Sequence, residues 1–144
     1  MALFTRKKRL FNRLLIVEDE PLVAFETEYF LRDEGFDVVG TVDRVDAALA
    51  LIEAGTVIDL VLVDISLADG SGVDVAKAAI AAGIVVLFVT GDCPLEAQLL
   101  ADGWLGKPYA QRDLAQAIAV IEGVRGGVVP KRLPPGFTLF KTVA

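Results

Sequence analysis

Carboxylates stand directly after two apolar segments of the sequence. Residues 14–17 read Leu-Leu-Ile-Val and precede Glu18 and Asp19, while residues 60–63 read Leu-Val-Leu-Val and precede Asp64. A carboxylate at the end of a buried strand needs a compensating partner, because burying an unpaired charge is costly. Three such groups in one crevice repel each other and require a cation. Oxygen ligands of this kind suit a hard ion such as Mg²⁺, which commonly shares itself with a phosphate.

Two more residues supply groups that phosphoryl chemistry uses. Thr90 closes the apolar segment 84–90 and offers a hydroxyl, and Lys107 follows residues 104–106 and offers a positive charge. With an aspartate nucleophile and a metal ion, these groups give the positioning and charge stabilisation that phosphoryl transfer to a carboxylate requires. The chain contains no histidine, which excludes a histidine dyad, a histidine metal ligand and an internal phosphohistidine.

The segments that carry these residues alternate between short apolar runs and runs with a helical period. We expect strands at 14–17, 37–42, 59–63, 84–90 and 104–106. We expect helices at 21–35, 44–55, 72–83, 94–103 and 110–123. No hairpin signal separates the strands, so the pattern predicts a doubly wound α/β fold with a parallel sheet and helices on both faces. In such a fold the site forms beyond the carboxyl ends of the strands.

The first expected helix has a clear period. Leu22, Phe25 and Tyr29 recur at helical spacing. Pro21 suits the first helical turn, and Gly35 suits the end of the helix.

Four stretches of the chain together resemble the receiver domain of bacterial two-component response regulators. They read LLIVEDEP (14–21), LVLVDISLADGSGVDVA (60–76), VTGD (89–92) and GWLGKPY (103–109), and they occur in the order and at gaps that suit this family. The resemblance covers residues 14–123. It implies a flavodoxin-like, five-stranded parallel sheet of order 2-1-3-4-5, with helices on both faces.

The resemblance also implies a role for each candidate residue. Asp64 would be the phospho-acceptor, and the Mg²⁺ ligands would be Glu18, Asp19, Asp64 and the backbone carbonyl of Ser66. Thr90 and Lys107 would contact the phosphoryl group, and Trp104 occupies the place of the family's switch aromatic. Ser66 and Asp92, two residues beyond Asp64 and Thr90, would tune the rate of dephosphorylation.

Two features depart from the family pattern. Only 17 positions separate Thr90 from Lys107, which predicts a fourth helix shortened to about two turns and puts signalling through the fourth-helix face in doubt. The stretch LFVTG (87–91) resembles the Phe-Ala-Thr-Gly signature of a subgroup of single-domain regulators, although Val89 replaces the alanine.

The leading functional interpretation is a phosphorylation switch of a two-component phosphorelay. A histidine kinase or a histidine phosphotransfer protein would donate the phosphoryl group, and the signal would pass to a downstream protein by direct contact. With no output domain in the sequence, the chain would act as a relay, a phosphate sink or a protein-binding regulator. It would not be an enzyme, beyond self-phosphorylation from a phosphodonor and slow self-dephosphorylation.

Two alternatives belong to other functional classes. A degenerate receiver would bind partners without phosphorylation. An Mg²⁺-dependent phosphohydrolase with an aspartate nucleophile would need a second acid two residues beyond Asp64, where this chain has Ser66.

Several single residues have simpler interpretations beside the functional ones. Glu20 suits a helix N-terminus, where a negative charge is favourable, better than a metal site. Trp104 and Tyr109 could fill the core. Cys93 lies near the expected site, where a redox role is an alternative to a buried thiol.

Charge divides the chain into three parts: a basic tail (1–13), the receiver domain (14–123) and a basic, proline-containing tail (124–144). Residues 14–123 hold all twenty acidic residues and only five basic ones, a net charge of −15. A body this acidic repels phosphates, so we expect no nucleic-acid binding by the core.

The two tails prompt separate expectations. Residues 6–9 (Arg-Lys-Lys-Arg) suit a solvated tail, with attraction to an anionic membrane or nucleic acid as the alternative. Phe137, Leu139 and Phe140 near the other end could dock on the acidic body as an arm.

Bulk composition points to the cytoplasm. We expect no transmembrane segment, because no apolar run approaches the roughly 20 residues that a membrane span needs. No signal peptide is visible, and the single cysteine suits a reducing compartment.

Overall fold

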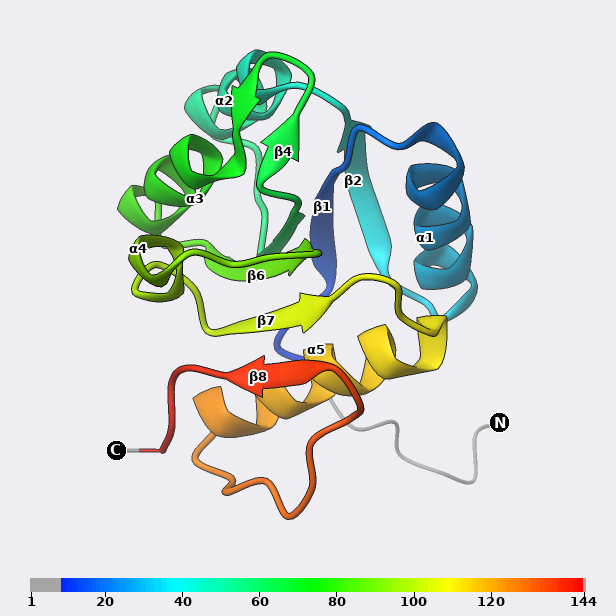
Figure 1. The fold of residues 1–144 in the computed structure, drawn as a ribbon, viewed down its shortest axis with the longest axis vertical. Helices are drawn as coiled ribbons and strands as arrows, with labels where there is room; N and C mark the ends of the chain where they lie inside the picture. Colours follow the sequence, from blue (N-terminus) through cyan, green and yellow to red (C-terminus); the bar gives the residue numbers. More distant parts are fainter. Residues whose placement is uncertain (1–8, 144) are drawn as a thin grey trace.

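Five parallel strands form the centre of the sheet in the computed structural model, which describes residues 9–143 (Figure 1). They are β1 (Arg13–Val17), β2 (Asp37–Val42), β3 (Leu60–Val63), β6 (Val85–Thr90) and β7 (Gly103–Gly106). Their spatial order is β2-β1-β3-β6-β7, and every neighbouring pair is parallel. The predicted order 2-1-3-4-5 is therefore confirmed. The basic stretch 6–9 lies outside the described residues except for Arg9.

Helices cover both faces of the sheet. They are α1 (Pro21–Asp33), α2 (Val45–Glu53), α3 (Gly72–Ala81), α4 (Leu95–Gln98) and α5 (Gln111–Arg125). Leu15 and Val17 of β1 pack on the side of α2 and α3, while Leu14 and Ile16 pack on the side of α1 and α5. Both faces of the strand are thus buried, which is why its sequence is continuously apolar.

The C-terminal segment adds a sixth strand that the sequence did not predict. Strand β8 (Phe137–Leu139) pairs antiparallel with β7, and the backbone N–H of Gly106 donates to the carbonyl of Gly136 at 2.9 Å. Phe137 is buried against Gly103, where an added Cβ would lie 2.5 Å from the phenylalanine ring. The expected arm therefore docks, and it does so on the edge of the sheet.

A buried carboxylate holds this strand and the last helix together. Asp102, 2% exposed, accepts two hydrogen bonds of 2.7 Å from the guanidinium of Arg125 and lies 3.3 Å from the ammonium of Lys141. Its carbonyl accepts from the N–H of Phe140 at 2.9 Å. Asp102 therefore joins the start of β7 to the end of α5 and to the residues after β8. Sequence reasoning missed it.

Two sequence expectations are wrong in detail. A small hairpin of β4 (Ser66–Leu67) and β5 (Gly70–Ser71) follows β3, although no hairpin was expected. Its two loop residues are Ala68 and Asp69, and Gly70 already belongs to β5, so the turn lacks the usual Asn-Gly or Asp-Gly signal at its centre. The fourth helix is a single turn of four residues rather than about two turns.

Helix α1 turns its apolar stripe outward. Leu22, Phe25 and Tyr29, whose spacing predicted the helix, are 69%, 69% and 70% exposed. The buried face of the helix, which packs on the sheet, is formed instead by Ala24, Thr27 and Leu31. Apolar side chains gathered on an exposed helix face are typical of a contact surface.

Among the described residues, no helix combines the length and the apolar composition that crossing a membrane requires.

Candidate functional site

The carboxyl ends of four strands bring the expected site residues together. Asp64 follows β3 and Glu18 follows β1, and the last residues of these strands, Val63 and Val17, are register partners. Thr90 ends β6 beside Gly106, the residue before Lys107. Glu18, Asp64 and Thr90 are each at most 6% exposed. The predicted groups therefore lie at one edge of the sheet.

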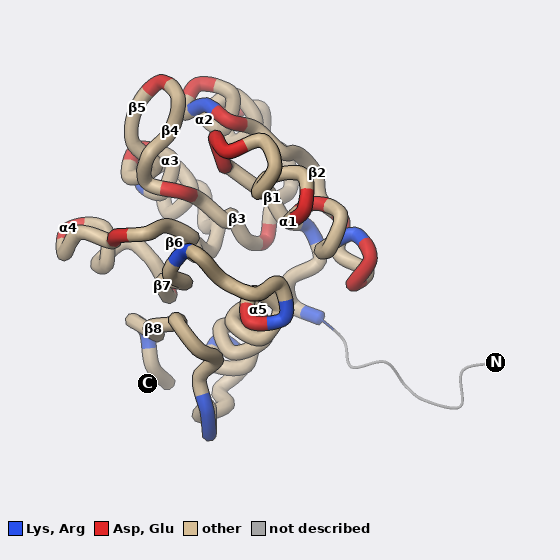
Figure 2. Tube along the Cα trace, turned by 45° about the vertical axis from the view of Figure 1, so that its right-hand side comes forward, with Lys and Arg blue, Asp and Glu red and all other residues tan. Residues whose placement is uncertain are grey.

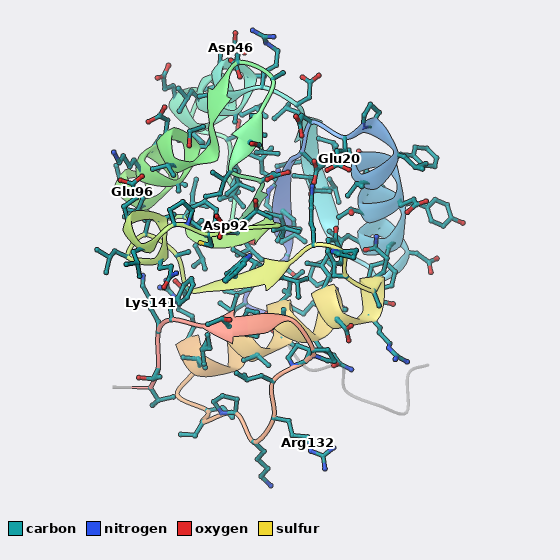
Figure 3. All side chains as sticks on the ribbon, in the orientation of Figure 1. Glu20, Asp46, Asp92, Glu96, Arg132 and Lys141 are labelled. Atoms are coloured by element: carbon teal, nitrogen blue, oxygen red, sulfur yellow. The ribbon has the colours of Figure 1, made fainter. Side chains whose placement is uncertain are left out.

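Lys107 is the centre of the ionic contacts. Its Nζ lies 2.8 Å from Oδ2 of Asp64, 2.5 Å from Oε1 of Glu18 and 3.0 Å from Oε1 of Glu20. The backbone N–H of Lys107 donates to the carbonyl of Thr90 at 3.1 Å, which fixes the residue at the end of β7. Figure 3 shows Glu20 on the α1 side of this edge.

Burial and charge oppose each other at these groups. Burial raises the pKa of Glu18, although the Lys107 hydrogen bond acts to lower it. Burial would lower the pKa of Lys107, but hydrogen bonds to Asp64, Glu18 and Glu20 outweigh it and raise that pKa. One ammonium thus faces several carboxylates, and the site holds an excess of negative charge.

The donor set fits a hard divalent cation. Glu18, Asp19, Glu20 and Asp64 each offer a carboxylate oxygen, and these four oxygens lie within 4.8 Å of one another. All are hard oxygen donors, and two of the residues are buried where an uncompensated charge is costly. Glu20 was expected to serve only the helix N-terminus, yet it belongs to this cluster and contacts Lys107 as well.

A close backbone packing holds the loop that carries Asp64. An added Cβ at Gly72 would lie 2.0 Å from the carbonyl oxygen of Asp64, so only glycine fits there. The N–H of Gly72 donates to the carbonyl of Ile65 at 2.7 Å, and the N–H of Ser66 donates to Oδ1 of Asp64 at 3.3 Å. Sequence reasoning treated Gly72 as an ordinary helix boundary and missed this role.

Trp104 is joined directly to Thr90. Its indole Nε1–H donates to the carbonyl of Thr90 at 2.9 Å, and the half-buried ring packs against the core beneath α3 and α4. Trp104 also pairs with Thr138 of β8. The residue therefore fills the core and links the site to the C-terminal strand.

Two residues after β6 differ in surroundings. Asp92 is exposed, and Figure 3 shows it beside the end of β6. Cys93 is 4% exposed, and burial, together with the nearby charge of Asp92, raises the pKa of its thiol to about 11. A buried, protonated thiol is inert, so the structure gives no support to a redox role.

A second polar pair anchors the loop after Lys107. The hydroxyls of Tyr109 and Thr27 lie 2.9 Å apart and connect this loop to α1. Burial raises the pKa of the Tyr109 phenol. We expected Tyr109 to pack in the core. Its hydrogen-bond partner Thr27 was not expected, because no local sequence pattern pairs residues 27 and 109.

Comparison with known proteins gives a consistent result. The model of the response regulator receiver domain matches residues 14–119. The sensory transduction protein RegX3 of Mycobacterium tuberculosis is 35% identical over 114 residues, which cover 75% of this chain and 49% of RegX3. The DNA-binding response regulator MtrA of Mycolicibacterium smegmatis is 31% identical over 74% of this chain and 49% of MtrA. The chain thus spans about half the length of these curated relatives.

Solved structures with the same fold include a CheY-like response regulator receiver domain protein from Methanospirillum hungatei. It is 32% identical, with a TM-score of 0.67 over 76% of this chain and 91% of that one. The response regulator PhyR of Brucella abortus is also 32% identical, with a TM-score of 0.63 over 80% of this chain and 49% of PhyR.

Proposed function

The chain belongs to the response regulator receiver domain family, and from this premise we propose that it is a phosphorylation switch whose phospho-acceptor is Asp64. The observation that carries the proposal is the contact of 2.8 Å between Nζ of Lys107 and Oδ2 of Asp64. It supports the proposal because an ammonium fixed beside a buried carboxylate compensates the cost of burying it, and the same ammonium can offset the charge of a phosphoryl group that arrives there.

In the proposed reaction, a carboxylate oxygen of Asp64 attacks the phosphorus of a partner's phosphohistidine. The new O–P bond forms as the P–N bond breaks, and the imidazole nitrogen keeps the electron pair. Lys107 offsets the charge on the phosphoryl oxygens, and the Thr90 hydroxyl donates a hydrogen bond to one of them. These roles are electrostatic, as phosphoryl transfer requires.

The acidic cluster supports Mg²⁺ as the cofactor. Glu18, Asp19 and Asp64 would hold it, together with the backbone carbonyl of Ser66. When bound, the ion supplies positive charge to phosphoryl oxygens. The donor set is entirely oxygen, as this ion prefers.

The phosphodonor must be another protein or a small molecule, because this chain has no histidine. A histidine kinase or a histidine phosphotransfer protein fits this requirement. The family is typically cytoplasmic, and the proposal assigns the chain to that compartment.

The output of the switch would pass through Thr90 and Trp104 to a downstream protein. A phosphoryl group on Asp64 would draw the Thr90 hydroxyl, and the hydrogen bond from Trp104 to the Thr90 carbonyl would transmit the movement. Asp92 and Ser66 would set the rate of the slow self-dephosphorylation that ends the signal; Asp92→Ala should change the lifetime of the phosphorylated form.

The test is intact-mass analysis after incubation with Mg²⁺ and acetyl phosphate. We expect the wild type to gain one phosphoryl group and Asp64→Asn to gain none, and chelation of Mg²⁺ should abolish the gain. Failure of the wild type to gain mass would instead favour a phosphorylation-independent binding module. Turnover of many donor molecules would favour a phosphohydrolase.

A further inference from the structure

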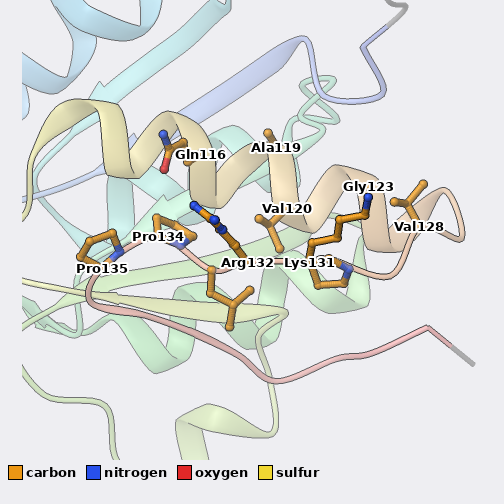
Figure 4. A pocket seen from close by; sticks show the side chains of 11 residues that line it. Gln116, Ala119, Val120, Gly123, Val128, Lys131, Arg132, Pro134 and Pro135 are labelled. Carbon is orange, nitrogen blue, oxygen red and sulfur yellow. The ribbon is translucent and has the colours of Figure 1, made fainter.

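An apolar groove with basic edges lies outside the candidate site. It measures about 590 Å³ and runs between the outer face of α5 and the chain segment 128–135 (Figure 4). Val120 of α5 forms one wall, and Val128 and Leu133 stand on the opposite wall. Val128 is 59% exposed and Leu133 is 44% exposed, so the groove leaves apolar surface open to contact.

The groove belongs to this chain rather than to the family domain. The family match ends at residue 119, and most of the lining residues follow it. The segment 128–135 is held in place by the strand β8 that comes after it and by the ion pair of Asp102 with Arg125. The groove is therefore a built part of the fold.

The charged residues that line the groove are both basic. Lys131 and Arg132 are the charged residues that line it, and both are exposed. Figure 2 shows these basic positions on the segment before β8, apart from the acidic positions gathered on the other side of the fold. A fitting occupant must be apolar with acidic flanks. Residues 1–8 of the chain do not meet this requirement, because their charges are three basic residues.

Helix α1 carries a surface with the complementary properties. Its exposed stripe of Leu22, Phe25 and Tyr29 is apolar, and Glu26 and Asp33 stand exposed beside it. Arg32 is exposed on the same helix and pairs with Glu28 at 3.2 Å, so the acids outnumber the bases there. The sequence places two more acids, Glu28 and Glu34, in or directly after the same helix. The apolar side chains of α1 match the apolar walls of the groove, and the carboxylates of α1 match Lys131 and Arg132 at the edge of the groove.

We propose that the groove of one molecule receives the α1 stripe of a second copy of this chain. Contact within one molecule is excluded, because α1 and the segment 128–135 face outward from different parts of the fold (Figure 1). The contact joins two different surfaces, so it forms either a closed ring or an open chain. The charge pairs in this contact are exposed and each is worth little, so the association is weak and dependent on protein concentration. This inference goes beyond the proposed phosphorylation and does not require it.

The test is sedimentation equilibrium of the full chain over a wide concentration range, with charge-reversal variants. Wild type should self-associate. K131E/R132E should weaken association on the order of tenfold, since two attractive pairs become repulsive. E26K/D33K should weaken it equally, and the protein carrying all four changes should recover to within about threefold of wild type, because the pairs are restored with reversed sign. The matched control is K77E, an exposed charge change on α3, which should leave association unchanged.

Three results would overturn the inference. The wild type could remain monomeric up to about 1 mM, a concentration that reveals even weak contacts. The groove variants could associate as the wild type does. The combined variant could stay as weak as its parents, in which case the two surfaces do not face each other. Circular dichroism of every variant verifies that the fold is retained.

Discussion

Gly72→Ala should displace the residue on which the proposed chemistry depends. The added Cβ would lie 2.0 Å from the carbonyl oxygen of Asp64, 2.8 Å from its carbonyl carbon and 2.9 Å from Cγ2 of Val63. Real Cβ atoms essentially never approach a neighbour closer than 3.0 Å, so backbone must move by about 1 Å. No side-chain rotation relieves a clash with backbone. We therefore expect a cost at the upper end of overpacking, about 3 kcal/mol of unfolding free energy.

The same displacement should slow phosphorylation. The 2.8 Å contact between Asp64 and Lys107 would not survive a 1 Å shift unchanged, and a misplacement of that size costs about hundredfold in rate. Urea denaturation measures the stability, and the initial rate of mass gain with acetyl phosphate and Mg²⁺ measures the reaction.

A matched control exists in the other loop at the site. Gly91 follows Thr90, has an ordinary negative φ and has no neighbour within 4 Å of an added Cβ. Gly91→Ala should change stability by less than about 0.5 kcal/mol. If Gly72→Ala were as stable and as fast to phosphorylate as Gly91→Ala, the close packing described here would be wrong.

Three further predictions concern the rest of the fold. Arg125→Met should cost about 3 kcal/mol in urea denaturation, because the buried Asp102 loses two hydrogen bonds of 2.7 Å. Lys141→Met should cost less than about 1 kcal/mol, because that ammonium makes one longer contact of 3.3 Å; equal costs would contradict this ranking. Alkylation of Cys93 at pH 8 should be at least about hundredfold slower in the folded chain than in urea, because raising the thiol pKa from 9.0 to about 11 leaves about one hundredth of the thiolate. The rate in the folded chain should climb as pH rises toward 11. Equal rates in the folded and unfolded chain would refute the burial of this thiol. Phe137→Ala should cost about 3 kcal/mol and release the Gly106 amide, which donates to Gly136, to hydrogen exchange; an unprotected Gly106 amide in the wild type would show that β8 does not form.

The strand ends were predictable because a simple rule connects them to the site. Continuous apolar runs before Glu18 and Asp64 indicated strands buried on both faces, and alternation with helices required a parallel sheet. Parallel strands end at one edge, so the residues that follow them meet there. The contacts of Lys107 with both carboxylates agree with that reasoning.

Other features depend on contacts that no local pattern records. Asp102 joins Arg125 and Lys141, which lie 23 and 39 positions further along the chain, and nothing in its neighbourhood distinguishes it from a surface acid. The outward direction of Phe25 was missed because helical spacing identifies an apolar stripe but not the side it faces. Gly72 was underestimated because the need for glycine arises from the backbone of Asp64, eight positions earlier.

The identity of the phosphorylated residue tests the central claim most directly. Borohydride reduction converts an aspartyl phosphate to homoserine, and peptide mass spectrometry then locates the modified position. After treatment with acetyl phosphate and Mg²⁺, we predict homoserine at residue 64 alone, and none in a Lys107→Ala sample prepared for the same time. Homoserine at residue 19, or a phosphoryl group that survives on Ser66 or Thr90 instead, would contradict the account.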